Sequence, residues 1–145
     1  MGKQKPNPQG ITNNLKNPID LFTPDIQRGY LEKVMDMNKG KNFIDRILNR
    51  DKYPYIPIKD KSGKETGGMT HKMASGSANI DGQEKFTVYP EIIYDKKTKQ
   101  LNYLDRAKYG DQAWQYAAKN KEFMQFDNPE EAEWVAKNYK MLWKK

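Results

Sequence analysis

Apolar side chains near the end of the chain recur at intervals of three and four residues, which is the spacing of one face of an α-helix. Asn128 can accept hydrogen bonds from the free amides of the first turn, and Pro129 suits the first helical position because its missing donor is not needed there. Glu131 stands where a capping-box carboxylate reaches back to the helix start. Residues 123–126 precede this signal as a short apolar run. The pattern predicts a strand that leads into an amphipathic helix. The apolar face of that helix consists of Ala132, Val135, Ala136, Tyr139, Leu142 and Trp143.

The same start signal occurs near the beginning of the chain, where Thr23 and Pro24 are followed by an acid. It predicts a helix from Pro24 to about Asn38, and Gly40 ends it. Its expected apolar face consists of Ile26, Tyr30, Leu31, Val34 and Met37. A second, shorter amphipathic segment follows, with apolar positions at Phe43, Ile44, Ile47 and Leu48.

Asp81-Gly82 is a strong hairpin signal, because both residues tolerate the positive φ that a tight two-residue turn requires. Residues 69–80 and 83–94 flank it and are predicted to form two antiparallel strands. Pro90 is expected at an edge or at the end of its strand, because it cannot donate to a sheet. Gly76 interrupts the first strand and predicts a bulge.

Residues 95–99 turn the chain again, residues 100–104 are expected to pair briefly as a third strand, and residues 105–119 read as a helix. The buried side of that helix is expected to consist of Ala113, Trp114, Tyr116 and Ala117. The fold class predicted from these elements is α+β: a small antiparallel sheet, centred on the Asp81-Gly82 hairpin, packed with amphipathic helices.

Three segments are predicted along the chain: an extended N-terminal arm over residues 1–20, a helical segment with a proline-rich link over 21–58, and an α+β domain over 59–145. Prolines in the arm forbid regular helix there. Two interpretations of the arm stay open, a disordered tail or an extended segment that orders on a neighbouring subunit. Within the third segment, residues 60–68 are polar and glycine-bearing and are expected to form a mobile loop.

Composition narrows the classes of partner. The chain has 145 residues, enough for one domain, and carries a formal charge of +7 with 36% hydrophobic residues. Its mean hydropathy of −1.07 is low for a compact globule. Acids are interleaved with the bases, as in Lys59-Asp60-Lys61, which favours a mixed solvated surface over a dedicated nucleic-acid groove. Cysteine is absent, so disulfides and thiolate metal sites are excluded, and no segment is long and apolar enough to predict a membrane span.

Candidate catalytic residues have simpler explanations. His71 is the single histidine, without a nucleophile or carboxylate at useful spacing, and is expected to be a strand residue with an ordinary hydrogen bond. Glu130, Glu131 and Glu133 lie in the first turn of a predicted helix, where the helix dipole favours negative charge. The sequence therefore predicts no catalytic residue, no cofactor and no metal site.

Aromatic residues near the limits of the core are candidates for contact with a partner, because aromatic side chains are enriched at interfaces. The spaced apolar residues of the arm and the region just after it are candidates for the same role. The predicted partner-binding residues are Ile11, Leu15, Ile19, Leu21, Phe22, Tyr53, Tyr55 and Trp143.

The C-terminal half, from Gly67 to Trp143, carries a recognisable order of motifs. These are Gly67-Gly68-Met69-Thr70-His71-Lys72-Met73, the Asn79-Ile80-Asp81-Gly82 hairpin with Phe86-Thr87-Val88-Tyr89-Pro90, the stretch from Ala113 to Ala118, and Phe126-Asp127-Asn128-Pro129-Glu130-Glu131-Ala132. This order resembles a small module found in virion-associated and structural proteins of tailed bacteriophages.

The resemblance implies a structural role in the virion and no reaction. The expected function is that of a minor structural protein that docks on a larger ring or shell, with the neck or tail favoured slightly over the capsid. Its expected partners are portal, tail or capsid subunits in a symmetric assembly of many copies, with the arm on a neighbouring subunit. The alternative is a basic nucleic-acid-binding protein that uses the loops at residues 59–64 and 96–99, whose affinity would fall steeply with salt. A third class, a cell-wall hydrolase accessory or enzyme, would depend on His71 or Glu131.

Overall fold

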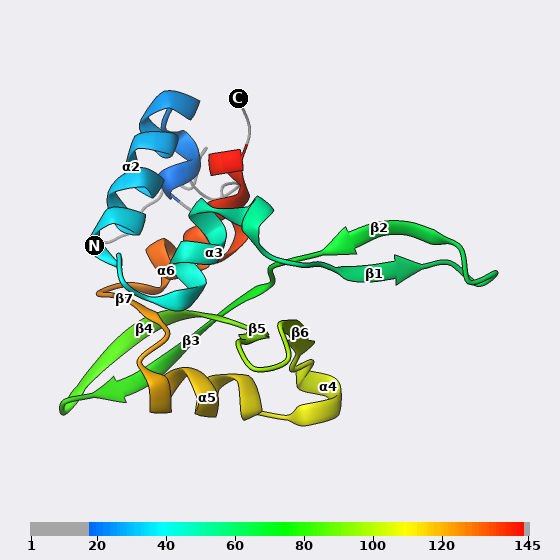
Figure 1. Cartoon of the computed structure of the whole chain (residues 1–145). Coiled ribbons are helices and arrows are strands. Elements are labelled where there is room, and N and C mark those ends of the chain that lie inside the picture. The colour runs from blue at the N-terminus through cyan, green and yellow to red at the C-terminus, as the bar shows by residue number, and fades with distance from the viewer. Residues whose placement is uncertain (1–17, 144–145) are drawn as a thin grey trace, which may run out of the picture.

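The computed structural model describes residues 18–143, which form an α+β fold of short helices and small antiparallel sheets (Figure 1). The helices are α2 (Pro24–Met37), α3 (Asn42–Leu48), α4 (Arg106–Tyr109), α5 (Gln112–Asn120) and α6 (Pro129–Asn138). The 3-10 turns are η1 (Pro18–Leu21), η2 (Arg50–Lys52) and η3 (Tyr139–Trp143). The strands are β1 (Ile56–Lys59), β2 (Glu65–Met69), β3 (Met73–Ile80), β4 (Gln83–Pro90), β5 (Ile92–Asp95), β6 (Gln100–Tyr103) and β7 (Met124–Phe126). The predicted fold class is confirmed.

The main sheet is antiparallel and has the order β3-β4-β7. Its hairpin turns at Asp81 and Gly82, whose φ angles of 53° and 84° are those that the sequence predicted. Pro90 pairs with Met73 at the end of β4, past the last residue that pairs with β7, so its missing amide costs no sheet hydrogen bond. The predicted bulge at Gly76 is wrong. The register runs without a shift along β3, and the Thr87 hydroxyl donates to the Gly76 carbonyl across the pair at 3.0 Å.

Helices cover both faces of this sheet, with α6 on one side and α5 on the other (Figure 1). Side chains alternate between the faces along a strand, so Val88 joins the core beside α6 while the Tyr89 ring packs on Trp114 of α5, with 5.3 Å between the ring centroids. Burial on both faces explains why adjacent β4 residues, Thr87 and Val88, are both inaccessible to water.

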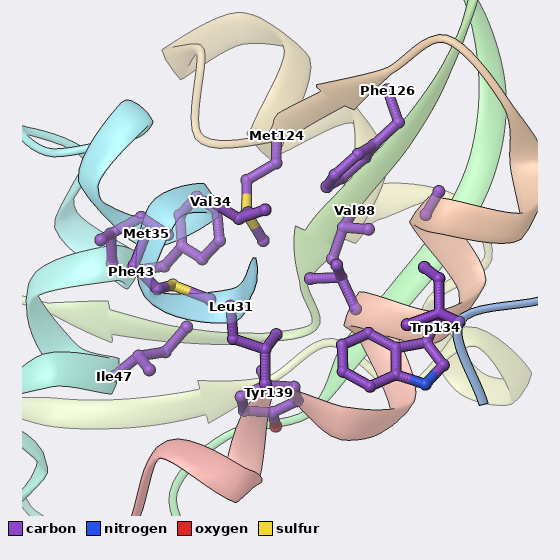
Figure 2. Close-up of a cluster of buried hydrophobic side chains, with 14 residues drawn as sticks. Leu31, Val34, Met35, Phe43, Ile47, Val88, Met124, Phe126, Trp134 and Tyr139 are labelled. Atoms are coloured by element: carbon purple, nitrogen blue, oxygen red, sulfur yellow. The ribbon is translucent and has the colours of Figure 1, made fainter. Parts of the chain in front are cut away.

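One apolar core joins the N-terminal helices to the sheet. Figure 2 shows its main members, which are Leu31, Val34, Met35, Phe43, Ile47, Val88, Met124, Phe126, Trp134 and Tyr139. Residues of the helical segment, from Leu31 to Ile47, therefore share one core with residues of the sheet and of α6. The folded body also includes residues 18–20 of the predicted arm: Ile19 is buried in the core, and the Trp134 indole donates to Asp20 at 3.1 Å. The remainder of the arm lies outside the described residues.

Helix α6 begins as its sequence predicts. Asn128 Oδ1 accepts from the Glu131 amide at 2.9 Å, and Pro129 occupies the first turn. The Glu131 carboxylate accepts from Asn128 Nδ2 at 2.6 Å and from the Tyr30 hydroxyl at 2.5 Å. Burial, reinforced by this bond to Glu131, raises the pKa of Tyr30. The hydrogen bond from Tyr30 to Glu131 therefore links α2 to the first turn of α6.

Replacing Asn128 with alanine removes the acceptor for the Glu131 amide and one donor to its carboxylate. We expect the free energy of unfolding to fall by about 1–2 kcal/mol, the usual cost of losing an N-cap side chain. Urea denaturation measures the change, and Asn128→Ser is the matched control because it keeps a neutral acceptor at the N-cap and adds no charge beside the Glu131 carboxylate. Equal loss in both variants would show that the cap bond does not stabilise α6.

Two helix predictions need correction. In α2 the residues that face the core are Leu31, Val34 and Met35, while Ile26 and Met37 are exposed. At 3.6 residues per turn, Ile26 and Met37 lie about a third of a turn away from Leu31.

The predicted helix over 105–119 is broken into α4 and α5 by Gly110, with φ 61° and ψ −130°. Ala113 and Ala117 are buried as predicted, but Tyr116 is 37% exposed. The predicted brief strand after the turn at 95–99 is β6. It pairs with β5 in a separate two-stranded sheet, and the third strand of the main sheet is β7.

Candidate interaction surface

A two-stranded hairpin formed by β1 and β2 projects from the body of the molecule (Figure 1). Residues 57–68 are all exposed, and only the root residues Ile56 and Met69 are half-buried. Of the predicted loop at residues 60–68, residues 60–64 form the turn, but residues 65–68 belong to β2, which corrects the prediction there. We call residues 56–69 the projecting hairpin.

A side-chain network closes the tip of the projecting hairpin. Asp60 Oδ1 accepts from the Ser62 amide at 2.9 Å, the Ser62 hydroxyl at 2.6 Å and the Lys64 amide at 3.0 Å. The hydrogen bond from the Ser62 hydroxyl is the first cause that lowers the pKa of Asp60. Gly63 has a φ of 87°, a conformation that favours glycine. These local bonds specify a turn where composition alone indicated a loop.

Glycines in β2 leave the apolar residues of β1 uncovered. Pro57 pairs with Gly68 and Ile58 with Gly67, so neither has a cross-strand side chain against it. Ile58 is 45% exposed. The hairpin therefore presents apolar atoms on both faces, one residue after the other along β1.

Tyr55 fills the space beside Gly68. A Cβ atom at Gly68 would meet the Tyr55 ring at 2.4 Å, so the glycine is required for this ring position. The Tyr55 hydroxyl donates to Glu65 at 2.7 Å, which raises the pKa of Tyr55. Tyr55 itself is 53% exposed, and its ring extends the apolar surface of the hairpin.

Hydrogen bonds and a ring contact anchor the chain on either side of the root of the projecting hairpin. Arg46 is buried in α3, and its guanidinium donates to the Thr70 carbonyl at 3.3 Å and to the Ile92 carbonyl at 2.5 Å. Burial lowers the pKa of Arg46. Tyr53 donates to Asp45, which raises the pKa of Tyr53 to about 12, and its ring meets Tyr94 edge-on at 5.1 Å. Tyr53 thus supports the root of the projecting hairpin through contacts with residues of its own chain.

The other predicted partner-binding residues are placed differently. The Trp143 indole donates to the Ile47 carbonyl at 2.8 Å, and the Arg50 guanidinium lies 4.3 Å from its ring centroid, so Trp143 closes this chain's own core. Ile19 is buried there as well. Leu21 and Phe22 are about half exposed before α2, while Ile11 and Leu15 lie outside the described residues.

His71 is not a strand residue, as its pattern suggested, but a buried residue of the β2–β3 connection. Its Nδ1 atom pairs with the Thr70 hydroxyl at 2.8 Å, and its ring lies against Trp143. Burial, followed by the charge of Arg46, lowers its pKa to about 3. Over residues 18–143, no three His, Asp or Glu side chains gather in a way that could hold a metal ion.

Sequence reasoning did not find the projecting hairpin, although Tyr55 was singled out. The sequence does contain a signal for its turn: Asp60 is followed three residues later by Gly63. This pair stands between the apolar run at 55–58 and Thr66. Pro57 and the Gly67-Gly68 pair obscured this signal, because both usually indicate loops.

Comparisons of the chain with protein-family models, curated proteins and solved structures give no match. Within the described part of the chain, no helix has the length and apolar character needed to cross a membrane.

Proposed function

We propose that this chain is a minor structural protein of a tailed-phage virion, and that its projecting hairpin docks on a larger ring or shell subunit, in the neck or tail. The observation that supports this proposal is a hairpin that is exposed on both faces and carries uncovered apolar side chains. The virion itself is proposed from the resemblance of the C-terminal half to phage structural modules.

Energetics favour a partner for the projecting hairpin. A two-stranded sheet alone is at best marginally stable in water, because it buries little apolar surface. Here the turn network at Asp60 and the anchored root hold the strands in register before any partner binds. Docking then loses little conformational entropy, and burial of Tyr55 and Ile58 supplies the affinity.

The edges of the hairpin restrict how it docks. Lys59 and Lys64 lie near its tip, and the β1–β2 register shifts between Ile58 and Lys59. Charged residues and irregular register discourage strand addition from another copy. We therefore propose that a groove in the partner encloses the hairpin and contacts Tyr55 on one face and Ile58 on the other. In a symmetric assembly each such contact is repeated, so modest affinity per copy suffices.

Particles assembled without this chain provide the test. We expect Ile58→Asp to weaken binding of the purified protein to such particles by at least about tenfold, because a charge replaces a central apolar contact. Ile26→Asp is the matched control: it makes the same change at a similarly exposed isoleucine on α2. Unchanged binding by Ile58→Asp, or loss confined to Ile26→Asp, would refute docking through the hairpin.

A further inference from the structure

Two adjoining hollows lie where α3, the β5–β6 sheet and α5 meet, and their volumes are about 520 and 910 Å³. Pockets that hold small ligands span roughly 300–1,000 Å³. The residues that line both hollows are Asn42, Ile93, Tyr94, Lys96 and Tyr116. The larger hollow also touches Ile56, at the root of the projecting hairpin. We call the joined hollows the tyrosine groove.

Aromatic rings form much of this groove. Tyr94 and Tyr116 line both hollows, and Tyr103 and Tyr109 line the larger one. Tyr116 is 37% exposed, and no other ring stacks on it and no side chain bonds its hydroxyl over residues 18–143. Tyr116 therefore lies between the two hollows, on the same helix as the buried Ala113 and Ala117, and its side chain is available to a ligand.

The rim carries unpaired positive charge. Lys41, Lys96 and Lys97 line the groove, and within the described range none of them forms an ion pair with a carboxylate. The groove is lined by five basic residues (Lys39, Lys41, Arg46, Lys96 and Lys97) against three acids, so its charge is net positive. Glu122 accepts from two α3 amides, Asp45 from Tyr53 and Asn49, and Asp95 from the amides of its own turn. The ligand that complements this rim is therefore anionic.

We infer that the tyrosine groove binds single-stranded nucleic acid, with a base stacked on Tyr116 and phosphates at Lys96, Lys97 and Lys41. Aromatic faces beside lysines are the usual means of holding a single strand, because every base has a face that stacks and every linkage a charge. The chain's own first residues are an unsuitable occupant. Residues 1–17 contain three lysines and no acid, so they repel the same rim. This inference does not depend on the proposed docking role.

Fluorescence anisotropy with an oligothymidine of roughly 12 nucleotides tests the inference. We expect binding at about 50 mM salt that weakens steeply by about 200 mM, as phosphate contacts require. Tyr116→Ala should lower affinity roughly 5- to 150-fold through lost stacking, while Tyr116→Phe keeps it. Lys96→Glu/Lys97→Glu should weaken binding and flatten the salt dependence.

Lys61→Glu/Lys64→Glu is the matched control, because it makes the same charge change at the hairpin tip. Thermal unfolding confirms that each variant is folded. Equal weakening by the tip and rim variants, or no effect of Tyr116→Ala, would show attraction by charge alone and overturn the site. Absence of binding at the lower salt would overturn it too, as would thymidine monophosphate binding as tightly as the oligonucleotide, or preference for an acidic peptide.

Discussion

Replacing Glu122 with alanine is expected to lower the free energy of unfolding by about 3 kcal/mol. Glu122 is 8% exposed, and its two carboxylate oxygens accept from the Asn42 and Phe43 amides, each at 3.0 Å. Lys41, at the N-cap of α3, makes no side-chain cap bond. The carboxylate thus caps α3 from 79 residues away in sequence and meets the positive end of the helix dipole. Its loss leaves the amide of the buried Phe43 without a partner and removes the cap bond to the amide of the exposed Asn42.

Urea denaturation gives the change directly. Glu122→Gln keeps an acceptor oxygen but loses the charge and one acceptor, and we expect it to cost about half as much. Glu133→Ala, an exposed glutamate on α6, is the matched control and should change stability by less than about 0.5 kcal/mol. If Glu122→Ala falls within the range of that control, the carboxylate does not hold α3 in place.

Mild acid should destabilise the protein through one residue, His71. Its pKa is lowered to about 3 in the folded chain, by burial first and then by the charges of Arg46, Lys140 and Arg50. In the unfolded chain the ordinary value near 6.5 returns. Above about pH 6.5 both states are neutral at this position and the full stability is present. As the pH falls from about 6.5 towards 3, His71 binds a proton in the unfolded state but not in the folded state. The free energy of unfolding therefore falls.

Between about pH 7 and pH 5 we expect the free energy of unfolding to fall by about 2 kcal/mol. The chain contains one histidine, and histidine is the side chain that normally titrates in this interval, so the slope belongs to His71. The matched variant is His71→Phe, which preserves a ring beside Trp143 and removes the titrating group. Urea unfolding at both pH values should show a flat profile for this variant. An equal slope in both proteins would contradict a buried neutral histidine.

Local signals explain which parts of the fold were predictable. The start of α6 and the Asp81-Gly82 turn depend on side chains within a few residues of the bonds they make. Glu122 was not predictable in this way, because its partners at the start of α3 are remote in sequence. Exposure of Ile58 was likewise hidden, since it depends on glycines in the opposite strand. Ile19 is buried and Trp143 is partly buried against the same core, although the sequence assigned both to a partner, because long-range packing decides their positions.

The candidate surfaces were also predictable only in their local features and not in their three-dimensional arrangement. Tyrosines and lysines were visible in the sequence, but the tyrosine groove brings together residues of α3, the β5–β6 sheet and α5, which no local pattern places side by side. Similarly, Tyr53 and Tyr55 are two residues apart and were predicted for one role. In the structure, Tyr53 lies at the root of the projecting hairpin and Tyr55 lies on its exposed face.

Hydrogen exchange of the full chain, with and without particles assembled in its absence, tests the proposed docking most directly. Amides of residues 56–69 exchange from an exposed two-stranded sheet in the free protein, so docking should slow them sharply, while those of β4 and α6 remain as they are. Binding to the particles with unchanged exchange across the projecting hairpin would contradict the account.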